Sequence, residues 1–297
     1  MIAVLVPVFL LAGVGWALGR FGRVSSRPLA QVAFWVFSPA LIFESLRTAE
    51  LSLAGTVVAF SLAHQVAMFA LSLAVGMIMF RRDLPARAAT SLVLTFGNCG
   101  NLGLPLLLFA YGPPGVDVGV VFLATNTVLL STLGVAVATW TGGRVRWRSV
   151  WGNLLRVPWA YAVGAALLVR WTGFPEVFSR ATGLLAGGAI PLFLLLLGLE
   201  LAHVRVKQVA RPALGLALVR LIAGGMLAWA LAWGFRTEGV LRGSLVIEGS
   251  VPSAVNAFLL ASQYDRRPDL AASVLFLSTL ISLGTLSLTL FLLRVGM

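Results

Sequence analysis

The sequence predicts an all-α polytopic membrane protein: ten transmembrane helices in two inverted five-helix repeats, with broken helices in the fourth and ninth positions. Three observations predict this fold class: the apolar composition, the side on which basic residues fall, and a weak repeat between the two halves. Hydrophobic residues make up 59% of the 297 residues, charged residues only 11%, and the mean hydropathy is +0.97. A soluble domain of this length has a far more polar composition.

Apolar runs between charges and turn residues define ten segments, each close to the roughly 20 residues that cross a bilayer. The segments cover about 2–19, 29–46, 53–80, 89–110, 115–140, 153–171, 178–202, 212–235, 240–262 and 270–293. They leave no room for a sizeable soluble domain. The first segment has no basic residue before it, so it is interpreted as a span and not as a cleaved signal peptide.

Basic residues gather on one side of this ten-span arrangement. Of the 22 basic residues, fifteen fall on one side, six on the other, and Arg220 inside a span. Because positive charge is retained in the cytoplasm, both termini are expected outside it. The larger set is Arg20, Arg23, Arg27, Arg81, Arg82, Arg87, Arg144, Arg146, Arg148, Arg156, Arg205, Lys207, Arg211, Arg266 and Arg267.

The net charge of +12 therefore sets topology and does not indicate a nucleic-acid partner, because no basic surface is interleaved with aromatic residues. Cys99 is the only cysteine, which excludes a disulfide framework. His64 and His203 are the only histidines, so no resident metal or other cofactor is expected, apart from a coupling sodium ion or proton.

The two halves resemble each other at a nearly constant offset. Pro39 matches Pro191 at an offset of 152, and Pro105 matches Pro252 at 147. Five spans per half is an odd number, so the second half enters the membrane from the opposite side. The predicted organisation is a first repeat over 1–140, a short basic cytoplasmic link over 141–152 and an inverted repeat over 153–297. Inverted repeats are typical of secondary transporters.

The fourth and ninth segments each carry polar, small and proline residues in the middle of an apolar run. The fourth reads Gly97 to Pro105 as GNCGNLGLP, and the ninth reads Glu248 to Asn256 as EGSVPSAVN. A proline removes a backbone donor and opposes the carbonyl four residues earlier, so both helices are expected to break and to line a cavity. The candidate substrate-binding residues are Asn98, Gly100, Asn101, Pro105, Ser250, Pro252, Ser253 and Asn256.

These two segments resemble the auxin efflux carrier family of membrane transporters, within the larger group of bile acid sodium symporters. Supporting matches are Ser38 to Phe43, Pro191 with Leu197 to Leu201, Arg220, and Ser278 to Leu280. The resemblance implies that the fourth and ninth helices cross at prolines beside the substrate. It also implies organic-anion substrates, such as malate, malonate or auxin. The short link favours a compact prokaryotic carrier in the cell inner membrane over a plant auxin exporter.

Two charged residues fall near the middle of predicted spans, where ionisable groups are expensive and indicate function. Glu248 is a candidate carrier of a coupling proton or cation, and Arg220 a candidate attractor of the anion. A purely structural ion pair between them is an equal alternative. His64 is expected to pack through a hydrogen bond, whereas Glu200 and His203 are expected at the solvated end of the seventh span.

The sequence thus favours a carrier of a small organic anion in a lipid bilayer that is not an enzyme. An intramembrane enzyme is the first alternative, but no Gly-x-Ser-x-Gly elbow, Walker A loop or Cys/His cluster supports it. A channel or sensor on the same scaffold is the second. The small-residue pattern Gly15-x-x-x-Gly19 leaves a homodimer open, because such patterns also pack helices within one subunit.

Overall fold

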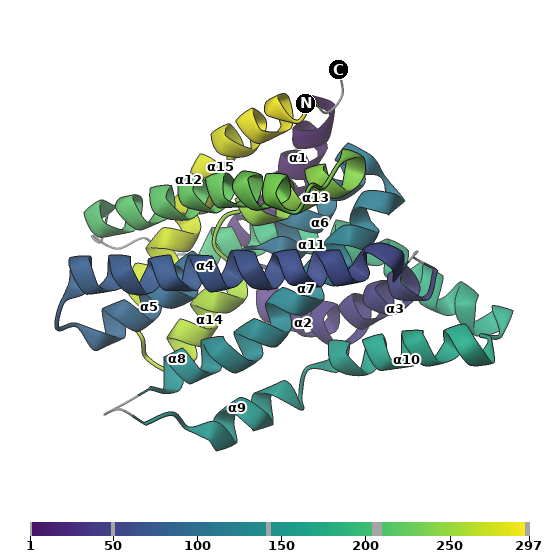
Figure 1. Cartoon of the computed structure of the whole chain (residues 1–297), viewed down its shortest axis with the longest axis horizontal. Helices are drawn as coiled ribbons and strands as arrows, with labels where there is room; N and C mark the ends of the chain where they lie inside the picture. The colour runs from purple at the N-terminus through teal and green to yellow at the C-terminus, as the bar shows by residue number, and fades with distance from the viewer. Residues whose placement is uncertain (1, 49–50, 141–143, 204–209, 295–297) are drawn as a thin grey trace.

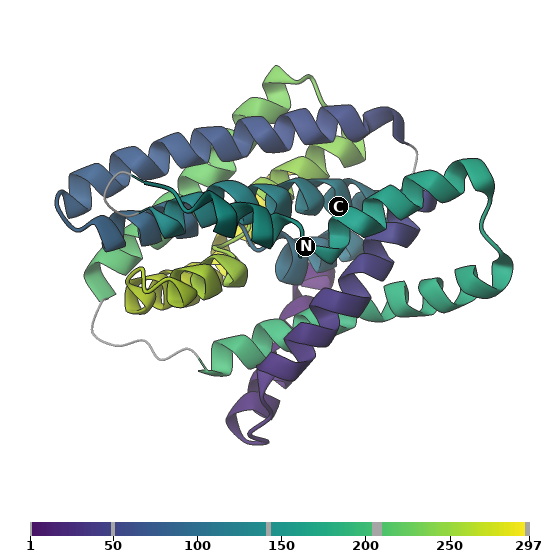
Figure 2. The same ribbon diagram turned by 90° about the horizontal axis from the view of Figure 1, so that it is seen from below.

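The computed structural model describes residues 2–48, 51–140, 144–203 and 210–294, which are almost entirely helical and contain no β-strand. Residues 141–143 of the predicted link lie outside these ranges, as do Arg205 and Lys207 of the predicted cytoplasmic set. Figures 1 and 2 show the helices as rods of different lengths that cross at different angles.

The first half contains long helices and several short ones. Its elements are α1 (Ile2–Arg20), α2 (Ser26–Val32), the π-helical turn η1 (Ala33–Phe37), α3 (Ser38–Thr48), η2 (Leu51–Leu53), α4 (Ala54–Phe80), α5 (Leu84–Thr95), the π-helical turn η3 (Cys99–Gly103), α6 (Leu104–Tyr111), α7 (Pro113–Leu129), η4 (Leu130–Gly134) and α8 (Val135–Thr139).

The second half has fewer elements. They are α9 (Trp147–Leu154), α10 (Pro158–Thr172), α11 (Glu176–His203), α12 (Ala210–Gly234), α13 (Gly239–Ser250), α14 (Val255–Gln263) and α15 (Pro268–Leu292). Every one of the ten predicted segments contains helix. The sixth begins later than predicted, because Pro158 opens α10 and the chain is not helical just before it.

Six helices or helix runs of the described residues are long and apolar enough to cross a membrane, or seven if the bent pair α9 and α10 forms one span. The six are Ser26–Thr48, Ala54–Phe80, Pro113–Thr139, Glu176–Ala202, Arg211–Gly234 and Pro268–Leu292. Val4–Arg20 and Cys99–Tyr111 are apolar but shorter. The chain is therefore a multi-pass, all-helical membrane protein.

Local chemistry sets where several helices begin. Asp83 accepts a hydrogen bond of 2.9 Å from the backbone N–H of Ala86 and so caps α5. Prolines occupy the first turn of α7, α10 and α15, where a missing N–H costs nothing.

Small residues allow α1 and α11 to pack closely against each other, and these two helices belong to a first group of packed helices. A side-chain carbon at Gly15 of α1 would collide with the backbone of Leu195 in α11, and one at Gly198 would collide with that of Ala12. Close backbone approach through small residues is how helices associate without a hydrophobic driving force. α3 packs against both α10 and α11, which completes this group.

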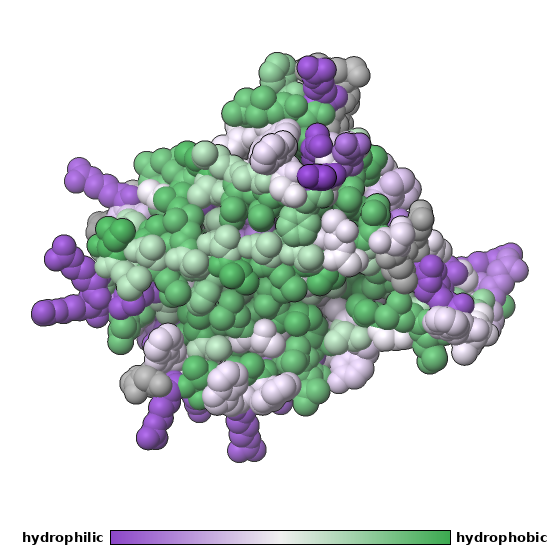
Figure 3. Space-filling model, viewed as in Figure 1, coloured by the Kyte–Doolittle hydropathy of each residue, from purple (hydrophilic) through white to green (hydrophobic). Residues whose placement is uncertain are grey.

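In a second group of helices, α4 and α12 lie side by side and α12 also packs against α13 and α15. In Figure 3 a broad hydrophobic surface covers the middle of the molecule, and hydrophilic side chains project from its margins. This distribution matches a surface that contacts lipid between two polar faces.

Candidate functional site

The two interrupted helices meet at their breaks. α5 ends at Thr95 and the chain resumes helix at Cys99, while α13 ends at Ser250 and α14 begins at Val255. Gly97 and Ser253 form an isolated antiparallel bridge between the two extended segments. Two backbone hydrogen bonds hold it: the Asn98 N–H donates to the Pro252 carbonyl at 2.8 Å, and the Ala254 N–H donates to the Phe96 carbonyl at 2.9 Å. The extended residues thus satisfy one another's backbone groups, as buried segments must.

The first break does not lie at Pro105, where the sequence predicted it. Pro105 sits in the first turn of α6, and the chain between it and the break forms the π-helical turn η3, in which the Gly103 N–H donates to the Asn98 carbonyl. Since η3 runs directly into α6, with the Leu104 N–H donating to the Cys99 carbonyl, Pro105 lies within a continuous helical run, and the π-helical turn before it accommodates the lost backbone donor. The bridge therefore forms at Gly97, eight residues before Pro105, although in the ninth segment Pro252 itself takes part.

Arg220 of α12 links the C-terminal ends of α5 and α13, the two half-helices that precede the breaks. Its Nε donates to the Val251 carbonyl at 3.1 Å, and its Nη1 donates to the Leu94 carbonyl at 3.1 Å. The side chain is fully buried, and a Cβ at Gly97 would collide with its guanidinium. A cation suits this position because carbonyl ends of helices carry partial negative charge. Arg220 therefore braces the crossing, and its donors Nε and Nη1 face carbonyls.

Glu248 is fully buried, and the Cys99 thiol lies near its carboxyl group. Its exposed fraction is 0%, and neither carboxyl oxygen has a hydrogen-bond partner among the described residues. The described ion pairs do not include one between Glu248 and Arg220. The carboxyl group packs against two glycines, since a Cβ at Gly103 would lie 2.5 Å from Oε2 and one at Gly119 would lie 3.0 Å from Oε1.

A small cavity of about 70 Å³ lies where the second half-helices begin. Of the predicted residues, Asn98, Gly100, Asn101 and Asn256 line it. Asn98 and Ala254, which precede η3 and α14, make no side-chain cap, so the first N–H groups of both helices lack a side-chain acceptor. Asn98 is 5% exposed and its Nδ2 has no hydrogen-bond partner among the described residues.

The other predicted residues lie behind the cavity wall. The Ser253 Oγ donates to the Val93 carbonyl at 2.7 Å, and the Ser250 Oγ donates to the Val246 carbonyl at 2.7 Å. Pro105, Ser250, Pro252 and Ser253 are absent from the lining of the cavity. These four residues do not line the cavity.

Asn126 and Glu200 are among the lining residues that were not predicted for the site. The Asn126 Nδ2 donates to the Gly97 carbonyl at 3.5 Å, and Glu200 of α11 accepts a hydrogen bond of 3.4 Å from the Asn101 Nδ2. The sequence placed Glu200 at a solvated helix end, but the structure places it in the cavity wall. One signal in the sequence pointed to Glu200, namely a carboxylate inside an apolar run. The position of Glu200 near the end of the span favoured the other interpretation.

His64 contributes to packing as predicted. Its Nε2 lies 3.1 Å from the Gly224 carbonyl, and its ring stacks on Phe60 at a centroid distance of 6.4 Å.

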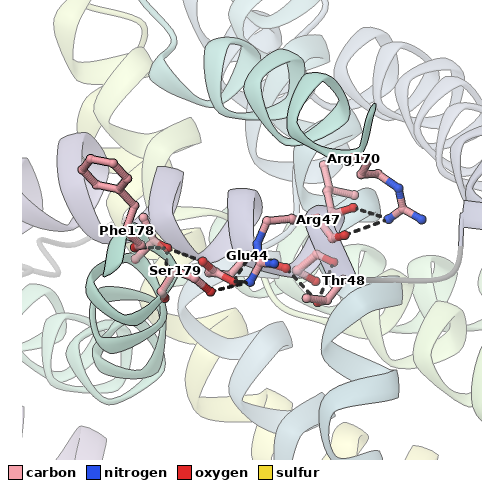
Figure 4. A network of polar contacts seen from close by, with 9 residues as sticks. Glu44, Arg47, Thr48, Arg170, Phe178 and Ser179 are labelled. Carbon is pink, nitrogen blue, oxygen red and sulfur yellow. Dashed lines mark hydrogen bonds and ion pairs between the residues drawn. The ribbon is translucent and has the colours of Figure 1, made fainter. Parts of the chain in front are cut away.

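A polar network lies at the opposite end of α11, where α3, α10 and α11 meet (Figure 4). The Arg47 guanidinium pairs with Glu44 at 2.5 Å and donates to the Ser179 Oγ at 3.0 Å. Arg170 of α10 donates to the Leu46 carbonyl at 2.8 Å, near the end of α3. These contacts hold the three helices together at the end predicted to face outward.

Comparison with known proteins agrees with this geometry. A family model described as "Membrane transport protein" matches residues 1–147 and 144–291. The chain belongs to this membrane transport family. It is a transporter and not an enzyme.

Two relatives of the chain show how far the similarity extends. An "Uncharacterized transporter" of Methanothermobacter thermautotrophicus is 30% identical over 97% of this chain and 95% of its own length. A "Putative malonate transporter" of Rhizobium meliloti is 25% identical over 77% of this chain and 74% of its own length. The similarity to the first relative thus covers both helix breaks.

Proposed function

We propose that this membrane transport protein is a secondary transporter that carries small organic anions by alternating access. The observation that carries the proposal is the cavity at the crossing. Two helix starts without side-chain caps and the unpartnered Asn98 amide offer donors and partial positive charge at one place. A carboxylate is the common metabolite group that such donors recognise best.

The proposed architecture is ten spans in two inverted five-helix repeats, over 1–140 and 153–297, joined by the short link. Helix in all ten predicted segments supports it, as do the interruptions in α5 to α6 and in α13 to α14. Placement in the cell inner membrane with both termini outside the cytoplasm rests on the distribution of basic residues. A homodimer stays a prediction.

The proposed substrates are malonate-like or malate-like carboxylates, with auxin-like acids as a second class. The name of the Rhizobium relative supports the first class. Coupling to a sodium ion or a proton is part of the proposal, because a carrier needs a gradient to accumulate an anion.

Alternating access requires a site that is open to one side at a time. A second cavity of about 840 Å³ shares Glu200, Val255 and Asn256 with the small one and reaches the exposed residues Arg27 and Gln263. Arg27 belongs to the predicted cytoplasmic set. The structure therefore resembles an inward-open state, which supports a carrier mechanism.

Uptake of radiolabelled malonate, malate and indole-3-acetate into proteoliposomes tests the proposal. Parent protein is expected to show saturable uptake of a carboxylate. Asn101→Ala and Asn256→Ala each remove an amide that can bond the anion, worth about 1.5–3 kcal/mol or about 10- to 100-fold in KM. Asn153→Ala is the matched control, because the Asn153 amide bonds the Ser149 carbonyl within α9. Absence of saturable uptake, or equal behaviour of the three variants, contradicts the proposal.

A further inference from the structure

Glu200 lies between the two cavities of the proposed pathway. It lines the small cavity at the crossing and also the larger cavity that leads to exposed residues. Asn256 shares this position on the opposite wall. A group at this boundary can exchange protons with water on one side and contact a solute on the other.

The Glu200 carboxylate accepts a hydrogen bond from an amide that the proposed substrate also needs as a donor. The Asn101 Nδ2 donates to the Glu200 Oε2 at 3.4 Å. A bound organic carboxylate that accepts from Asn101 would bring a second carboxylate close to the first. Like charges this close in a site of low dielectric repel strongly, and only one of them remains ionised.

The helix starts at the small cavity offer partial positive charge for one anion, but the described lining residues hold no cationic side chain that could offset a second negative charge. Glu200 is the one carboxylate among its lining residues, and they include no Lys, Arg or His. Arg220 does not line the cavity, and its Nε and Nη1 face carbonyls. A proton on Glu200 removes the repulsion and supplies a donor to the incoming anion.

Charged and titratable groups on neighbouring elements do not provide that compensation. Arg27 of α2 and Asp269 of α15 line the larger cavity, are exposed and have opposite charges. The side chain of His203 lies outside the part of the chain that the structure describes. On the other elements packed against α11, the groups are the exposed Arg20 at the end of α1, Glu44 and Arg47 of α3 at the far end of α11, the neutral thiol Cys99 of η3, and Tyr111 of α6.

Glu248, the coupling residue that the sequence suggested, is less suited to this role. It is 0% exposed and lines neither of these two cavities. In this conformation neither of these two cavities connects Glu248 to water.

We propose that Glu200 carries a proton that is transported together with the carboxylate. The inference rests on the proposed function. The anion binds only when Glu200 is protonated, so one proton and one anion occupy the site together, and both leave to the same side. No bond other than the O–H bond of Glu200 forms or breaks.

Proteoliposomes loaded at pH 7.5 and diluted to an outside pH of about 6.5, with the potential clamped at zero, test the coupling. Parent protein is expected to accumulate malonate about tenfold over the protein-free control for one pH unit. Glu200→Gln mimics the protonated acid, so it is expected to lose this accumulation and to keep malonate/malonate counterflow. Glu176→Gln, on the same helix but exposed, is the matched control and is expected to accumulate malonate like the parent.

The outcomes separate this inference from the proposed function. Accumulation by Glu200→Gln, or parent transport that ignores the pH gradient, overturns the role of Glu200 and leaves the carrier intact. Loss of counterflow in Glu200→Gln with full recovery in Glu200→Asp also overturns it, because the carboxylate would then be needed for binding itself. A parent that moves no carboxylate overturns both.

Proton uptake by the detergent-solubilised parent gives a second readout that needs no variant. Binding of malonate at a pH of about 9, where free Glu200 is ionised, in weak buffer with a pH indicator is expected to take up about one proton per anion. Binding without proton uptake overturns the inference.

Discussion

Replacement of Arg220 by methionine tests whether this side chain braces the crossing. Methionine keeps an unbranched stem but removes the donors to the Leu94 and Val251 carbonyls, both of which belong to fully buried residues. A buried acceptor left without a partner costs about 1–3 kcal/mol, so the two together destabilise the crossing by about 2–6 kcal/mol. Even the lower value raises the population of the locally opened state about 30-fold.

Cys99 makes this change measurable. It is the only cysteine, it is 1% exposed, and it begins the π-helical turn beside the bridge. The rate of labelling by a thiol-reactive fluorophore in detergent therefore reports how often the crossing opens. Arg220→Met is expected to accelerate labelling about 30-fold or more. Arg211→Met, at the exposed start of the same helix, is the control. Equal labelling rates in the two variants would refute the bracing role.

Two further substitutions test packing elsewhere. Gly103→Ala places a Cβ about 2.5 Å from the Glu248 carboxylate and is expected to lower the free energy of unfolding by about 1–3 kcal/mol, whereas at Gly100 the nearest atom would be 3.6 Å away and little change is expected. Equal melting temperatures for the two variants would contradict this packing. Glu44→Gln weakens the network of Figure 4 and is expected to cost about 1 kcal/mol in thermal unfolding, whereas Glu176→Gln should have no measurable effect because its ion pair is exposed.

The sequence located both helix interruptions and the asparagines beside them. Gly97, Asn98 and Pro252 stand in apolar runs where the helix is interrupted, and Asn101 and Asn256 lie in the helical turns that follow the breaks. Such signals can be found without a fold because they depend on neighbours along the chain. The exact place of the first break could not be found, since Pro105 suits a first helical turn as well as a kink.

By itself the sequence determined that the chain is apolar and helical, where it is interrupted, and on which side its charges are expected. These properties follow from composition and from neighbours within a few residues. Only the tertiary structure decided which distant groups meet: Arg220 with the two carbonyl ends, Glu200 with Asn101, and Glu248 with two glycines. Most of those contacts join residues about a hundred or more positions apart in the chain. They depend on how the helices pack and on the side-chain conformations at the interface, and neither can be predicted from a local sequence pattern.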